Sequence, residues 1–328
     1  MKEILNQLIN QQPLTKVQAQ EIMLRMANGD FSDVEITAFL TTYLMRPVSV
    51  DELAGFRDTL LELAVPLDFG DMTAIDLCGT GGDGRDTFNI STLTALIVAA
   101  AGYKVVKHGN YGVSSVSGSS NVLEQLGYTF SNNQDTLQRQ VEQHNICFLH
   151  APLFHPAMKA VGPARRSLKV KTFFNLLGPL VNPASPSHQL VGVYDLQVAR
   201  LYQHFLQQVD RSFRIVHALD GYDEVALTGE VKVIGNQEET LLAPADFGLP
   251  VYAPEDLYGG KTVAEAARIF VAVVSGEGSR AQEDVVLANA GLAIRCLQPA
   301  TPLVDCVAEA REALQSGKAR QLLSAITG

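Results

Sequence analysis

Residues 76–121 read DLCGTGGDGRDTFNISTLTALIVAAAGYKVVKHGNYGVSSVSGSSN and contain two glycine-rich turns, separated by an apolar helix and a strand. The first turn, GTGGDG at residues 79–84, follows a short apolar run and precedes NIST at residues 89–92. Ser91 is expected to cap the helix, and its hydroxyl can act as cap, as ligand or as both. Backbone amides freed by glycine and a helix N-terminus both favour an anion. The pattern therefore predicts a strand, a loop and a helix start that bind a negatively charged ligand.

The second turn is KHGN at residues 107–110, after the strand-like residues 104–106. It places a lysine, an imidazole and an amide within one turn, and a serine-rich segment follows it. Two anion-binding loops in one stretch suggest a ligand with two phosphate-bearing ends. The stretch has neither GxGxxG with a distant acid nor GK[ST], and none of its serines lies in GxSxG. These absences argue against a dinucleotide, a nucleoside triphosphate and a hydrolase nucleophile.

The composition is that of a soluble globular protein. The 328 residues are 47% hydrophobic and 18% charged, and 25 basic against 35 acidic side chains give a net charge of −10. This balance argues against nonspecific nucleic-acid binding as the main function. The four cysteines form no CxxC pair, so neither a zinc site nor a disulfide framework is indicated. Because the longest apolar run is too short to span a bilayer, we expect a cytoplasmic protein.

The first 65 residues have a helical pattern. Thr15 with Gln18, and likewise the pairs 32/35 and 49/52, fit capping boxes that precede apolar residues at helical spacing. We expect a small all-helical N-terminal domain of about four helices, residues 1–70. The proline-rich segment 155–183 could be an insertion, but its helical pieces favour a return to this domain over residues 165–185.

From residue 74 onward the pattern changes to short β-like runs that alternate with helices. The expected strands are residues 74–77, 104–106, 146–150, 190–194 and 213–218, with an antiparallel piece near 231–234 and long amphipathic helices after it. Such alternation predicts a large α/β domain, residues 71–328, with a mostly parallel sheet flanked by helices. Ligands of such sheets bind at the carboxyl ends of the strands. Both glycine loops are expected at such ends.

Two adjacent acids, Asp223 and Glu224, follow the expected strand 213–218. Neighbouring acids in a loop are often only solvated. However, a diphosphate-bearing ligand generally arrives with Mg²⁺, which takes one or two carboxylates and keeps several waters. We therefore treat this pair as a candidate magnesium site.

Seven motifs together resemble one family. In chain order they are GTGGDG, FNIST, KHGN, SSxSGS, HPAMK, FNLLGPLVNP and LDGYDE. The set resembles the anthranilate phosphoribosyltransferases of the nucleoside phosphorylase superfamily, over essentially the full length. The resemblance implies a homodimer that transfers a 5-phosphoribosyl group from 5-phosphoribosyl 1-diphosphate (PRPP) to the amine of anthranilate, with Mg²⁺. The product would be N-(5-phosphoribosyl)anthranilate, in tryptophan biosynthesis.

The resemblance also implies site residues. It assigns PRPP to Gly79, Gly82, Asp83, Thr87, Asn89, Ser91, Thr92, Lys107, Ser115 and Ser119. It assigns the metal to Ser91, Asp223 and Glu224, and anthranilate to Gly79, Asn110, His155 and Arg165. The candidate catalytic residues are Lys107 and Arg165, already named as ligand residues, and His108. Lys107 would help to stabilise departing diphosphate, and His108 would line the approach of anthranilate.

The second loop departs from the family pattern. Tyr111 and Gly112 stand where members commonly carry Arg-Ser, Val116 where a basic residue is frequent, and Asn121 where Asp is usual. The loop thus has less positive charge than the family pattern. Two alternative functions stay open from the sequence: a pyrimidine nucleoside phosphorylase of the same superfamily, and a noncatalytic nucleic-acid-binding relative.

Overall fold

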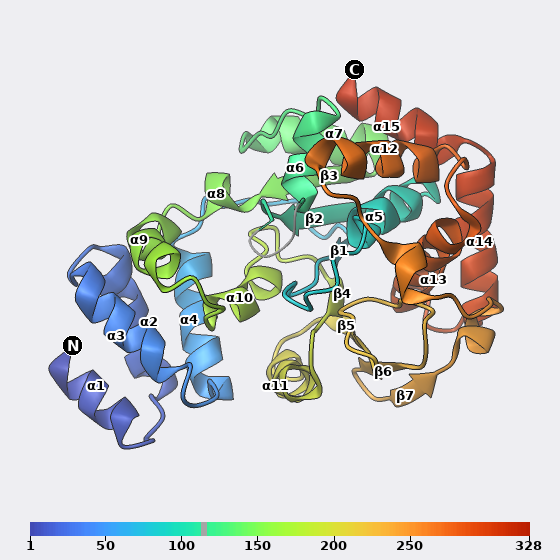
Figure 1. Ribbon diagram of the computed structural model, residues 1–328. Coiled ribbons are helices and arrows are strands. Elements are labelled where there is room, and N and C mark those ends of the chain that lie inside the picture. Colours follow the sequence, from blue (N-terminus) through green and yellow to red (C-terminus); the bar gives the residue numbers. More distant parts are fainter. Residues whose placement is uncertain (113–116) are drawn as a thin grey trace. The chain divides into compact units, whose positions relative to one another are not determined.

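The computed structural model describes residues 1–112 and 117–328, which form two compact units (Figure 1). The helical unit comprises residues 1–67 and 151–185, and the α/β unit comprises residues 68–150 and 186–328. Each unit is described by itself.

The helical unit begins with four helices whose starts are set by the sequence. Capping boxes at Thr15, Ser32 and Ser49 are present as expected. The helices are α1 (Lys2–Ile9), α2 (Lys16–Ala27), α3 (Asp33–Thr42), α4 (Val50–Glu62), α8 (Ala151–Phe154), α9 (Met158–Leu168), α10 (Phe174–Leu177) and the 3-10 helix η1 (Gly178–Leu180).

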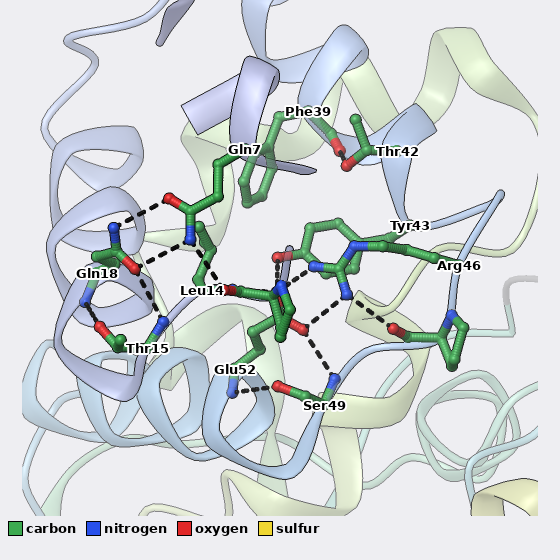
Figure 2. Close-up of polar contacts among 12 residues, drawn as sticks. Gln7, Leu14, Thr15, Gln18, Phe39, Thr42, Tyr43, Arg46, Ser49 and Glu52 are labelled. Carbon is green, nitrogen blue, oxygen red and sulfur yellow. Dashed lines mark hydrogen bonds and ion pairs between the residues drawn. The ribbon is translucent and has the colours of Figure 1, made fainter. Parts of the chain in front are cut away.

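An aromatic cluster and a buried ion pair fill this unit. The Phe56 and Phe173 rings stack with centroids 4.6 Å apart, and Phe39 meets both rings edge-on. Glu52 on α4 is fully buried and pairs with Arg46, and its carboxylate also accepts a hydrogen bond from the Tyr43 hydroxyl, 2.9 Å away (Figure 2). The carboxylate thereby links α4 to the end of α3 and to the turn after it.

A seven-stranded sheet forms the centre of the α/β unit, in the order β3-β2-β1-β4-β5-β6-β7. The strands are β1 (Ile75–Leu77), β2 (Val105–Gly109), β3 (Ile146–His150), β4 (His188–Gly192), β5 (Ser212–Ala218), β6 (Val231–Gly235) and β7 (Glu239–Leu242). The first five strands in this order are parallel, and β6 and β7 join antiparallel. The carboxyl ends of β1, β4 and β5 therefore lie next to one another.

Helices cover this sheet. They are α5 (Ile90–Ala100), α6 (Ser119–Gln125), α7 (Gln134–His144), α11 (Leu196–Leu206), α12 (Val263–Val274), α13 (Arg280–Leu297), α14 (Leu303–Gln315), α15 (Lys318–Thr327) and the 3-10 helices η2 (Pro244–Phe247) and η3 (Pro254–Leu257). The longest, α13, packs on β1, β4 and β5 and also contacts α5 and α14 (Figure 1). The predicted α/β class with a mostly parallel sheet is confirmed. Within the described ranges, no helix is both long and apolar enough to cross a membrane.

Candidate active site

The GTGGDG segment is a loop between β1 and α5, as the sequence predicts. Gly81, Gly82 and Gly84 have φ values of +63°, +82° and +72°, which side chains rarely tolerate. Gly79 is required for a different reason: a Cβ there would lie 2.7 Å from the Asp223 carboxylate. The loop is thus shaped to let its backbone pass close to the acid pair.

Ser91 contacts Glu224, the second acid of the pair, directly. Its backbone amide and its hydroxyl both donate to Glu224 Oε1, at 3.0 and 2.5 Å. The expectation that Ser91 caps the helix is wrong, because α5 begins at Ile90 and Asn89 is the N-cap residue. Asn89 makes no side-chain cap hydrogen bond, and its side-chain Nδ2 atom donates to the Ser117 carbonyl at 3.2 Å. The Glu224 carboxylate instead accepts a first-turn amide, where the helix dipole favours negative charge.

Asp223 is buried and Glu224 is half-buried, and the environment of both carboxylates disfavours their charge. Burial, with the Asp83 carboxylate nearby, raises the pKa of Asp223 to about 7, although the Gly81 amide donates to it at 2.8 Å. Burial, with Asp223 beside it, raises the pKa of Glu224 to about 8. Both shifts mean that the ionised forms lack compensating positive charge.

These groups fit a magnesium ion. Two carboxylates and the Ser91 hydroxyl offer only oxygen atoms, the ligands that Mg²⁺ prefers. A divalent cation would also supply the charge whose lack raises both pKa values. Among the described residues no group of three or more His, Cys, Asp or Glu side chains could hold a metal. The ion would therefore complete its shell with water or with oxygens of its substrate.

A small pocket lies at the carboxyl ends of β1, β4 and β5. It is lined by Leu77, Cys78, Gly79, Ser91, Thr94, Leu190, Gly192, Val216, Asp223, Glu224 and Asn289. Gly192 and Asn289 were missed by the sequence reasoning. The signal for Asn289 was available, because it is an amide within the otherwise apolar run VVLANAGLA of a long helix.

Lys107 and His108 lie in a strand rather than in a turn. The sequence placed the strand at 104–106, but β2 pairs with β3 from Val105 to Gly109. Both polar residues are buried and engaged: Lys107 Nζ donates to the Leu77 carbonyl, and the His108 amide donates to Asp76 Oδ1 at 3.1 Å. The lysine ammonium therefore lies at the end of β1, where the GTGGDG loop begins.

The end of the second loop is held by Asn121. Its Oδ1 atom accepts hydrogen bonds from the Gly112 and Gly118 amides, both at 3.0 Å. The Asn110 carbonyl accepts from the Ser119 hydroxyl at 3.3 Å. This brings two of the predicted ligand residues, Asn110 and Ser119, into contact. Ser115 and Val116 lie outside the described residues.

Tyr111 makes contacts that the family pattern does not predict. Its ring meets the His150 ring edge-on, with centroids 4.6 Å apart, and its hydroxyl donates to Glu124 Oε1 at 2.7 Å. The His150 ring in turn stacks against the Phe130 ring. An aromatic contact thus holds the loop where a cation is common in the family.

The remaining predicted residues divide between the two units. In the α/β unit, Thr87 forms a β-bridge with Tyr258, and Thr92 is buried in α5. In the helical unit, the Arg165 guanidinium lies 5.2 Å from the Phe174 ring centroid, and burial lowers its pKa. His155 Nε2 lies 2.9 Å from the Val181 carbonyl.

Comparison with known proteins identifies the class first. Residues 2–64 match the helical bundle domain of the glycosyl transferase family, and residues 71–320 match its a/b domain. Fold and site thus define a glycosyl transferase. An anthranilate phosphoribosyltransferase from Flavobacterium psychrophilum is 52% identical over 98% of each chain, and one from Cytophaga hutchinsonii is 53% identical over 97% of each. The chain belongs to the anthranilate phosphoribosyltransferase family, which confirms the resemblance drawn from the seven motifs.

Solved structures of anthranilate phosphoribosyltransferases have the same fold as this chain. The anthranilate phosphoribosyltransferase from Thermus thermophilus is 34% identical, with a TM-score of 0.91 and coverage of 98% of both chains. The Saccharomyces cerevisiae enzyme in complex with PRPP and Mg is 26% identical, with a TM-score of 0.91 and coverage of 98% of this chain and 95% of that one. The same yeast enzyme is also known in complex with 4-fluoroanthranilate, at a TM-score of 0.87.

Proposed function

We propose that the protein transfers the 5-phosphoribosyl group of PRPP to the amine of anthranilate in a Mg²⁺-dependent reaction, giving N-(5-phosphoribosyl)anthranilate and diphosphate. The observation that carries the proposal is the contact of Ser91 with Glu224 beside the GTGGDG loop. It joins an anion-binding helix start to a cation-binding acid pair. A Mg-diphosphate group needs both.

The donor would bind in the α/β unit. We assign it to the described residues Gly79, Gly82, Asp83, Thr87, Asn89, Ser91, Thr92, Lys107 and Ser119, together with Ser115. Asp223, Glu224 and Ser91 would hold Mg²⁺, which neutralises charge that develops on the departing diphosphate. The buried Lys107 ammonium at the end of β1 would add a second positive charge.

The acceptor needs positioning more than it needs a base. The aromatic amine is already neutral at pH 7, so holding it in line with the anomeric carbon is the main requirement. We assign anthranilate to Gly79, Asn110, His155 and Arg165, with His108 lining its approach. The planar guanidinium of Arg165 suits a carboxylate because it can donate two parallel hydrogen bonds.

The proposal also covers the domain division, the oligomeric state and the location of the protein. We infer a helical domain of residues 1–70, with a return segment at 165–185, and an α/β domain of residues 71–328. The two compact units of the chain support a two-part division, with a longer return segment, residues 151–185. The protein would be a cytoplasmic homodimer, in keeping with a biosynthetic enzyme.

The activity is tested by incubating the protein with anthranilate, PRPP and Mg²⁺. Anthranilate fluorescence should fall as product forms, and omission of Mg²⁺ should stop the loss. No turnover at any Mg²⁺ concentration, or phosphorolysis of thymidine or uridine instead, would contradict the proposal.

The acceptor role of Arg165 gives a sharper test. Arg165→Ala should raise the KM for anthranilate about 10- to 100-fold, because a charge-assisted carboxylate contact is lost, and should change the KM for PRPP far less. Arg166→Ala is the matched control, since it removes the same charge from an exposed position one residue along α9. Equal effects of Arg165→Ala on both substrates would argue against the acceptor role.

A further inference from the structure

Asn289 is an amide side chain buried in the middle of α13 that makes three hydrogen bonds. Its Oδ1 atom accepts from the Val225 amide at 3.1 Å, and its Nδ2 atom donates to the Val225 carbonyl at 2.9 Å. The same Nδ2 atom also donates to the Val285 carbonyl, one turn back along α13, at 2.8 Å. One carboxamide thus pairs with both backbone polar groups of Val225, as a neighbouring strand would.

Val225 directly follows the acid pair, in a connection with no helix or strand. The chain from β5 to β6 runs through residues 219–230, and Val225 within it is buried. Buried backbone groups outside regular structure need partners, because water cannot reach them. Asn289 supplies these partners at the residue next to Glu224.

The acid pair tolerates little displacement. A Cβ on Gly192 would lie 1.5 Å from the Asp223 carbonyl oxygen, so the connection packs directly against the end of β4. A Cβ on Gly79 would lie 2.7 Å from the Asp223 carboxylate. Asn289 lines the same pocket as Asp223 and Glu224. A small shift of Val225 would therefore move both carboxylates.

We propose that Asn289 is a positioning residue, which fixes the Val225 backbone and thereby sets the two carboxylates at the spacing that the Mg-diphosphate end of the donor requires. This inference rests on the proposed function, because it concerns the same metal site. It adds a residue that lies 64 positions further along the chain than Val225 and acts on the carboxylates through the Val225 backbone.

The test compares Asn289→Ala with Asn289→Thr. The alanine variant loses all three hydrogen bonds, and the threonine variant keeps a similar volume and one hydroxyl. We expect the Mg²⁺ concentration for half-maximal turnover to rise about 10- to 100-fold in Asn289→Ala, the usual size of an outer-shell effect, and less in Asn289→Thr. The KM for anthranilate should stay within about twofold of the wild type, since none of the three hydrogen bonds involves a residue assigned to anthranilate.

A second readout does not depend on turnover. Mg²⁺ with inorganic diphosphate should raise the Tm of the wild-type protein, and this gain should shrink in Asn289→Ala. Ile294→Ala is the control for stability alone: it truncates a fully buried side chain of α13 that lies about 140° round the helix from Asn289. It should lower the Tm while leaving the Mg²⁺ response unchanged.

Two outcomes would overturn the positioning role of Asn289, and a third would contradict the proposed function. If the wild type responds to Mg²⁺ and Asn289→Ala responds at the same concentration with the same gain in Tm, the positioning role is overturned. If Ile294→Ala shifts the Mg²⁺ response as much as Asn289→Ala, the effect is one of stability and the role is likewise overturned. A wild type without Mg²⁺-dependent turnover would instead contradict the proposed function.

Discussion

At the residue scale, the carboxylates of Asp223 and Glu224 lie where desolvation disfavours their negative charge. Their pKa values of about 7 and about 8 are well above the ordinary values of 3.8 and 4.5. Such shifts gather at functional sites, because a site built for a cation is unstable without it. The strain is therefore consistent with a metal site and is a cost to the unliganded protein.

This strain predicts how stability depends on pH. Because both folded-state pKa values are raised, the unfolded chain gives up these protons first, and the free energy of unfolding falls from about pH 4 to about pH 8. Thermal unfolding without metal should give a lower Tm at pH 8 than at pH 6, and Mg²⁺ should reduce the difference. Glu224→Gln should flatten the slope, whereas Glu277→Gln, at an exposed position, should not. An unchanged slope in Glu224→Gln would refute this account.

At the element scale, the sequence located the elements better than their ends. The GTGGDG loop, the helix after it and the capping boxes depend on neighbouring residues, so they could be read directly. The end of β2 and the cap of α5 could not, because each depends on a distant partner. Pairing with β3 extends β2 through Lys107 and His108, and Glu224 replaces the expected cap of α5.

The Asn121 contact at the second loop predicts a kinetic effect. Asn121→Ala removes the acceptor of two backbone hydrogen bonds, each worth about 1 kcal/mol, so the KM for PRPP should rise by roughly tenfold or more. Asn121→Asp is the comparison, since it keeps the acceptor oxygen and should behave nearly as the wild type does. The KM for PRPP of both variants is measured by steady-state kinetics, with PRPP varied at saturating anthranilate. Equal impairment of both variants would show that the acceptor oxygen is not what matters.

At the scale of the whole molecule, each compact unit has its own core, and the helical unit depends on one buried ion pair. Glu52 accepts hydrogen bonds from Arg46, Tyr43, the Leu14 amide and the Ser49 amide (Figure 2). Capping boxes predicted only the last of these. The carboxylate thus caps the start of α4 and also joins α4 to the turn before α2 and to the end of α3.

Removal of Glu52 should destabilise the helical unit selectively. Glu52→Ala leaves Arg46 buried without its partner carboxylate, which typically costs about 3–5 kcal/mol. Asp58→Asn is the control, because its ion pairs with Lys16 and Arg57 are partly exposed and each should contribute at most about 1 kcal/mol. Hydrogen exchange should show the loss in α2 and α4 amides. A Glu52 variant no less stable than Asp58→Asn would refute the argument.

The sequence by itself determined the family, the fold class and the local form of each phosphate-binding segment, because glycine turns, caps and alternating patterns act over a few residues. Only the tertiary structure decided what meets at the site. Glu224 reaches Ser91 across 133 positions, and Asn289 reaches Val225 across 64. These contacts exist because the sheet places β1, β4 and β5 side by side and packs α13 against them. Strand order is a property of the whole core, and no local spacing of residues encodes it.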